Sequence, residues 1–147
     1  MTDTINTVAL KDFEVILAEK YAQVLTNKSK GIIICILLVD YVPIEDFKAV
    51  FNKITTIIKA GAYQKFIFDK QALRAFHQPS MEWYFLEWKK EVYQYGIKTH
   101  RKILPKEAWF VKMVMIAKKQ IIMDHPANII KDLDIKYCDT INEAILN

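Results

Sequence analysis

The sequence predicts an α/β domain with a mixed, mostly parallel sheet and an N-terminal β-hairpin. Short runs rich in isoleucine, valine and phenylalanine alternate with longer segments whose apolar residues recur every three to four positions. The chain has only three glycines, and each falls at the boundary of an expected element. Because strands alternate with helices along most of the chain, parallel strands joined by right-handed crossovers are favoured.

The expected hairpin comes first. Residues 21–25 alternate in the manner of a strand, and residues 27–30 have the composition of a turn. Residues 31–39 follow as a second strand, because this run is too short and too β-branched for a helix.

The clearest helix is expected over residues 43–60. Pro43 suits its first turn, and Glu45 and Asp46 complement the positive end of its dipole. Its apolar residues follow the spacing of a one-sided stripe. Residues 65–69 then form a short strand that is apolar on both faces, a pattern typical of a buried strand covered by helices.

The second half of the chain continues the alternation. A helix is expected over 79–95, a weak and unusually polar strand over 97–104, and a third helix from 106 to about 123. A last strand lies within 130–138. The spacing of 140–143 is that of a capping box, which predicts a short terminal helix.

The totals predict one domain. A chain of 147 residues can bury a sufficient core without disulfides or metals. We expect an N-terminal arm at 1–19 and a single domain over 20–147. The net charge of +4 is a mild excess that does not indicate a nucleic-acid partner.

The sequence indicates a cytoplasmic protein. Cys35 and Cys138 lie in apolar or strand-like segments and are expected to be buried free thiols. The first residues are polar and acidic, unlike a secretory signal. The longest apolar run, 32–39, is too short to cross a bilayer as a helix, so no transmembrane segment is expected.

At this level the chain resembles the STAS/SpoIIAA-like family of bacteria. The resemblance rests on the helix start at 42–47, the buried strand ending in aspartate at 66–69, the Trp-bearing helix at 82–88 and the ending at 140–144. It implies a mixed sheet with helices and a role in binding rather than catalysis. Relatives include anti-sigma-factor antagonists and cytoplasmic domains of anion transporters, and the fold is similar to lipid-binding CRAL-TRIO domains. The antagonists' phosphorylatable serine has no counterpart in 70–74, so the resemblance implies no phosphoswitch here.

No catalytic, metal or cofactor motif is apparent. His77, His100 and His125 do not lie at metal-ligand spacing. Lys98, His100 and Lys102 would share one face of a strand. This basic segment has two interpretations: a solvated outer strand protected by charge, or a contact for a phosphate or an acidic ligand.

Two helices carry more apolar surface than one sheet face can cover. The core stripes are expected to comprise Met81, Phe85, Trp88 and Val92 in the first, and Phe110, Met113, Val114, Ala117 and Ile121 in the second. A second set lies away from those stripes: Trp83, Leu86, Tyr93, Val111, Met115 and Ile122. Neighbouring segments could cover this second set, or it could form a homodimer interface, a partner surface or an apolar pocket.

These observations lead to one hypothesis and two alternatives. The hypothesis is a non-enzymatic protein-binding or regulatory domain of STAS-like type that self-associates as a homodimer or binds a protein partner. The first alternative is a carrier or sensor of a small apolar, lipid-like ligand bound between the helices and the sheet. The second is peripheral attachment to a membrane through the helix at 106–123, where lysines accompany a tryptophan and methionines.

Overall fold

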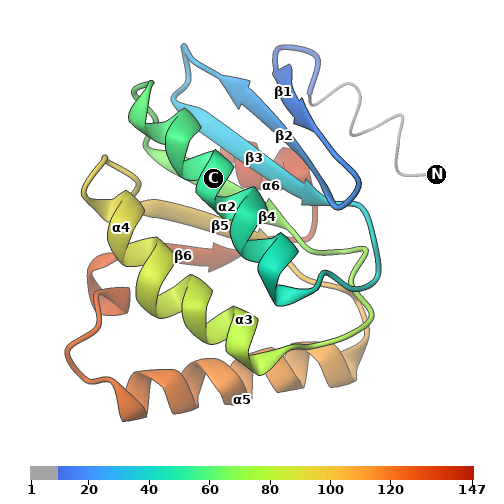
Figure 1. The fold of residues 1–147 in the computed structure, drawn as a ribbon, viewed down its shortest axis with the longest axis vertical. Helices are drawn as coiled ribbons and strands as arrows, with labels where there is room; N and C mark the ends of the chain where they lie inside the picture. The colour runs from blue at the N-terminus through green and yellow to red at the C-terminus, as the bar shows by residue number, and fades with distance from the viewer. Residues whose placement is uncertain (1–9) are drawn as a thin grey trace.

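The computed structural model describes residues 10–147 and has an α/β fold with one six-stranded mixed sheet (Figure 1). The strands are β1 (Glu14–Ala18), β2 (Ala22–Asn27), β3 (Ile32–Leu37), β4 (Lys65–Asp69), β5 (Thr99–Ile103) and β6 (Asp134–Tyr137). The helical elements are α2 (Ile44–Lys59), α3 (Gln78–Trp83), a π-helical turn η1 (Tyr84–Trp88), α4 (Lys89–Tyr93), α5 (Ala108–Asp124), a 3-10 turn η2 (Ile130–Asp132) and α6 (Ile141–Leu146). The predicted fold class is confirmed.

The strands lie in the sheet in the same order as in the chain. Strands β1, β2 and β3 pair antiparallel, and β3 to β6 pair parallel. The predicted hairpin is β2–β3, with Val24 opposite Cys35. One strand was not expected: β1 lies within the predicted arm and pairs with β2, and the chain bulges between Val15 and Leu17. The rest of that arm, residues 1–9, lies outside the described residues.

The helices are distributed unequally over the two faces of the sheet. Figure 1 shows α2, the continuous α3–η1–α4 segment and α5 side by side on one face, with α6 on the other. On the α6 face, Ile141 and Ala144 pack with Ile34, Ile67 and Ile103. The Thr140 side chain accepts a hydrogen bond from the Glu143 N–H at 3.0 Å, so the predicted start of α6 is confirmed.

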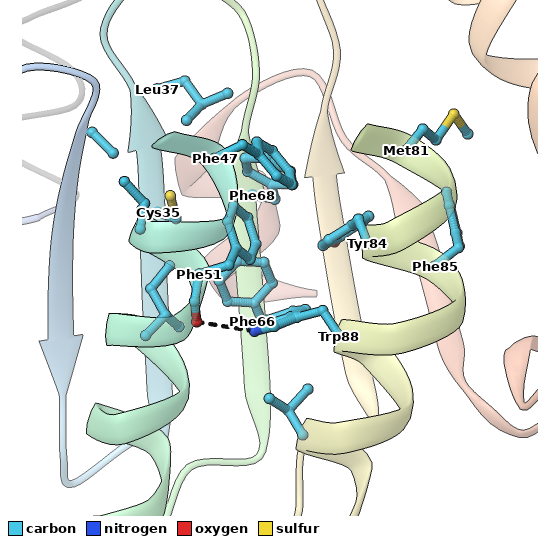
Figure 2. Packing of buried hydrophobic residues seen from close by; sticks show 14 of the residues in the cluster. Cys35, Leu37, Phe47, Phe51, Phe66, Phe68, Met81, Tyr84, Phe85 and Trp88 are labelled. Carbon is cyan, nitrogen blue, oxygen red and sulfur yellow. Dashed lines mark hydrogen bonds between the residues drawn. The ribbon is translucent and has the colours of Figure 1, made fainter. Parts of the chain in front are cut away.

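Aromatic side chains dominate the core on the three-helix face (Figure 2). The Phe51 and Trp88 rings meet edge to face, with centroids 4.8 Å apart. The Trp88 indole N–H donates to the Phe51 carbonyl at 3.1 Å and to the Thr55 hydroxyl at 2.9 Å, which ties α3–η1–α4 to α2. Phe66 and Ile67 of β4 are fully buried on opposite faces, as the sequence predicts.

The helix expected over 79–95 is interrupted by the π-helical turn η1. An α-helical pattern assumes about 100° per residue, and a π turn is wider. Met81, Phe85, Trp88 and Val92 are buried as predicted. Tyr84 and Lys89 are buried as well, because the wider turn directs more residues inward and the segment lies between α2 and α5.

Candidate functional site: an apolar pocket beside buried lysines

An apolar pocket opens where β3 and β4 end, next to the first turns of α2 and α3. Its empty space, including the open mouth, is ≈ 550 Å³. The lining includes Leu37, Phe68, Lys70, Phe76, Tyr84 and Phe110. The pocket therefore lies beyond the carboxyl ends of the parallel strands β3 and β4.

Lys70 is the lysine of this pocket. It directly follows β4, and its backbone N–H donates to the Ile103 carbonyl at 2.9 Å. Its Nζ lies 5.2 Å from the centroid of the Phe68 ring, and the residue is only 8 % exposed. Within residues 10–147 this amine has no hydrogen-bond partner. Burial, and secondarily the charge of Lys118, lower the pKa of Lys70 from 10.5 to about 8.

His77 and Ser80 form the polar rim at the start of α3. The His77 Nδ1 lies 2.8 Å from the Ser80 hydroxyl and also accepts from the Ser80 backbone N–H at 3.3 Å. Pro79 suits the position between them, since the first turn of a helix needs no N–H there. The pair caps α3, and both side chains line the pocket.

Behind the pocket wall lie two further amines, those of Lys89 and Lys102. Both residues are fully buried, and neither Nζ has a conventional acceptor within the described chain. Tyr84, a residue of the pocket lining, lies next to both: its ring centroid is 4.8 Å from Lys89 Nζ and 5.1 Å from Lys102 Nζ. Lys102 Nζ also lies 3.8 Å from the centroid of Phe85.

The charged side chains in and behind the pocket wall are lysines. Lys118 of α5 and Lys70 add their charge to that of the buried pair. Within residues 10–147 none of the four lysines forms an ion pair with a carboxylate. Burial first, and the neighbouring lysines second, lower the pKa of Lys89 and Lys102 well below the usual range. A buried ammonium without a counter-charge is unfavourable, so these amines must be neutral or receive an anion.

The residues predicted to contact an anion do not all lie together. Strand β5 is internal, between β4 and β6, so the interpretation of its basic segment as a solvated outer strand is wrong. His100 and Lys102 are fully buried on the three-helix face. Burial and the adjacent cations lower the pKa of His100 well below its usual value. Lys98 precedes β5 and is exposed, with Nζ 5.3 Å from the Tyr93 ring centroid.

The predicted interface residues differ in their exposure. Trp83, Leu86 and Tyr93 are half-buried, and the Trp83 ring packs edge to face against Phe47 at 6.1 Å between centroids. Neighbouring helices therefore cover much of this set. Val111 is likewise half-buried. The other two residues, Met115 and Ile122, are 40 % and 38 % exposed.

Helix α5 exposes more apolar surface than expected. Met113 was assigned to its core stripe, but this is wrong, because the side chain is 45 % exposed. α5 is apolar on most sides, so the sequence pattern cannot define its inner face. The outward residues Trp109, Met113, Ile116 and Met123 form an exposed stripe at helical spacing.

Sequence reasoning missed Lys70, Tyr84 and Lys89. The position of Lys70 held a usable signal, because the residue follows a buried strand at the carboxyl end of a parallel sheet. Tyr84 and Lys89 offered no such signal, since their burial depends on the π-helical turn.

Comparison with known proteins adds no assignment: no family model, curated protein or solved structure matches the chain. Within residues 10–147, no helix is long and apolar enough to cross a membrane. The same part of the chain contains no cluster of three or more histidine, cysteine, aspartate or glutamate side chains able to hold a metal ion. Cys35 and Cys138 are buried free thiols, as predicted.

Proposed function

We propose that the protein binds a small amphipathic ligand that carries an anionic group. The carrying observation is the group of four lysines beside an apolar pocket, without a carboxylate partner in the described chain. This proposal corresponds to the carrier or sensor of a small apolar ligand that the sequence suggests, except that the ligand also carries an acidic group. The resemblance to STAS/SpoIIAA-like domains, itself still a proposal, agrees with binding rather than catalysis.

The apolar part of the ligand would contact the aromatic and aliphatic lining. Phe68, Phe76 and Phe110 supply surface that gains stability when water leaves it. The anion would lie beside the Lys70 amine, which has no other partner in residues 10–147. A charge-assisted hydrogen bond in this apolar setting is stronger than its counterpart in water. A short-chain or aromatic monocarboxylate combines these two features.

The test compares a carboxylate with its neutral analogue. Hexanoate and hexanamide are titrated into the protein by calorimetry at pH 7, where Lys70 is mostly protonated because its pKa is about 8. Hexanoate is expected to bind at least ~10-fold more tightly, about 1.4 kcal/mol for one charged hydrogen bond. Lys70→Met should remove this preference, whereas Lys28→Met, at an exposed lysine in the β2–β3 turn, should preserve it.

The pH dependence gives an independent check. Hexanoate needs the protonated amine, so its affinity should fall as the pH rises through about 8, the pKa of free Lys70. Equal affinities for hexanoate and hexanamide, or a preference unchanged in Lys70→Met, would refute the assignment of the anion to Lys70.

Helix α5 favours a second candidate function, contact with an anionic membrane surface. Its exposed stripe contains Trp109, Met113 and Ile116, and Lys112 and Lys119 lie on the same outward side. Residues 108–123 include no aspartate or glutamate. Aromatic and methionine side chains beside lysines are typical of helices that lie in the lipid interface.

Vesicle flotation tests this second candidate. The protein should float with vesicles that contain phosphatidylserine and not with phosphatidylcholine alone. Ile116→Glu should abolish flotation, while Leu38→Glu, at another exposed apolar site outside α5, should not. Flotation that is insensitive to Ile116→Glu would remove α5 as the contact.

A further inference from the structure

The amine of Lys70 has surroundings that suit a nucleophile as well as a cation. It belongs to the lining of a pocket at the surface, and the residue is only 8 % exposed. No hydrogen bond or carboxylate within residues 10–147 engages it. Resting on the proposed ligand pocket, we propose that Lys70 Nζ forms an imine with small apolar aldehydes or ketones that enter it.

The lining explains why the amine can be free of its proton. Phe68 and Leu73 offer apolar surface in place of water, which favours the neutral form of a lysine. Lys118 lies close enough for its positive charge to act in the same direction, and together these effects lower the pKa of Lys70 to about 8. Enzymes that use lysine as a nucleophile activate it by the same two means, desolvation and a neighbouring cation.

The other ionisable groups around Lys70 do not oppose the neutral form of its amine. Tyr41, His77 and Tyr84 are the remaining titratable residues of the lining, and none of them is an acid that would hold the ammonium form at neutral pH. Lys89 and Lys102 lie behind Tyr84 and have the same sign of charge as Lys70. Asp69 precedes Lys70 in sequence, but its carboxylate accepts hydrogen bonds from Gln71 on the opposite face of the sheet.

The fraction of neutral amine is the quantity that matters. At pH 7 an amine with a pKa of about 8 is neutral in roughly one molecule in ten, against about one in three thousand for a lysine at its ordinary value of 10.5. Lys70 thus holds about 300-fold more free amine than an exposed lysine at that pH. A lower pKa also makes an amine intrinsically less nucleophilic, so the expected gain in rate is smaller, about tenfold or more.

The reaction needs no reagent beyond the carbonyl compound. The Nζ lone pair attacks the carbonyl carbon, and the oxygen takes up a proton to give a carbinolamine. The hydroxyl then leaves as water with one further proton, while the nitrogen loses its two hydrogens and forms the C=N bond. Amine and carbonyl compound therefore give imine and one water.

The test traps the imine with hexanal and sodium cyanoborohydride, which reduces C=N to a stable secondary amine. Intact mass and peptide mapping then locate the adduct and give its rate. At pH 7, Lys70 is expected to be labelled at least tenfold faster than any exposed lysine. Relative to the exposed lysines, its advantage should shrink above pH 8, because their neutral fraction keeps rising. Lys70→Met should lose the fast adduct, and Lys28→Met, at an exposed lysine in the β2–β3 turn, should retain it.

The outcomes separate this inference from the proposed function. Hexanal adducts spread over exposed lysines with Lys70 unmodified would overturn the inference, even if hexanoate binds as proposed. Fast labelling of Lys70 without hexanoate binding would support the inference and remove the carboxylate ligand. The peptide map of the labelled wild-type protein shows by itself whether Lys70 is modified, so the result does not depend on whether Lys70→Met folds.

Discussion

The buried lysines should make the protein more stable in mild alkali than at neutral pH. In the folded chain the pKa of Lys70 is lowered from 10.5 to about 8. Between these two values the unfolded chain holds a proton that the folded chain does not. The free energy of unfolding therefore rises with pH across this window. At about 1.4 kcal/mol per pH unit over roughly 2.5 units, Lys70 contributes at most about 3 kcal/mol.

Other buried ionisable groups also change how the free energy of unfolding depends on pH. Lys89 and Lys102, with pKa values also lowered by burial, act in the same direction as Lys70. Burial raises the pKa of Tyr84, and raises that of Tyr137 to about 12. Burial also raises the pKa of Cys35 and Cys138. Above roughly pH 9 the unfolded thiols, and above roughly pH 10 the unfolded tyrosines, lose protons that the folded groups keep, which lowers stability. The maximum is therefore expected between about pH 9 and 10.

Urea titrations at pH 7, 8, 9 and 10 measure this effect. In the wild type, the free energy of unfolding should increase from pH 8 to pH 9. In Lys70→Met, the protein should be more stable at pH 7, and the increase should be smaller by about 1.4 kcal/mol or less. A wild-type free energy that is constant or falls over this range would show that the lysines are not buried in the way the structure has them. A rise of equal size in Lys70→Met would exclude Lys70 as its source.

Three further expectations concern packing and association. Phe51→Ala should cost ~3–5 kcal/mol in a denaturant titration, since the residue is fully buried, and a loss below about 1 kcal/mol would place α2 outside the core. Trp88→Phe should cost ~1–3 kcal/mol, because the hydrogen bonds to Phe51 and Thr55 are lost; an unchanged unfolding midpoint would contradict this. Self-association remains a prediction. Light scattering should show a dimer, and Ile122→Glu should convert it to a monomer without changing the melting temperature. Trp83→Glu should instead lower the melting temperature, because Trp83 packs on α2. A wild type that is monomeric at high micromolar concentration would contradict the homodimer.

The sequence predicts elements well where local pattern and chain topology agree. Phe66 and Ile67 lie in a central strand because an uninterrupted apolar run has no stable place at a solvated edge. α2 follows its stripe because one side of the helix meets the sheet and the other meets water. β1 was missed because its exposed residues carry no inward pattern, and only pairing with β2 orders them.

The candidate site was less accessible to sequence reasoning. The polarity of Thr99 to Lys102 favoured an outer strand, and the rule that charge stays in water gave the wrong position for Lys102. Lys102 can be buried there because aromatic rings surround its amine. Burial and the neighbouring lysines also lower its pKa, which favours the neutral form. Neither feature is visible along one strand. Lys89 shows the same limit, because a single π-helical turn decides which way it faces.

The arrangement of the strands in chain order bears on how the protein folds during synthesis. Each new strand has its neighbour already in place, so the sheet can grow from one edge without long-range rearrangement. The α6 face is different, because Leu25, Ile34 and Ile67 stay uncovered until α6 has been made. A nascent chain that pauses before residue 141 would hold a completed sheet whose α6 face exposes its apolar residues. A chaperone would bind, or chains would associate prematurely, at that stage.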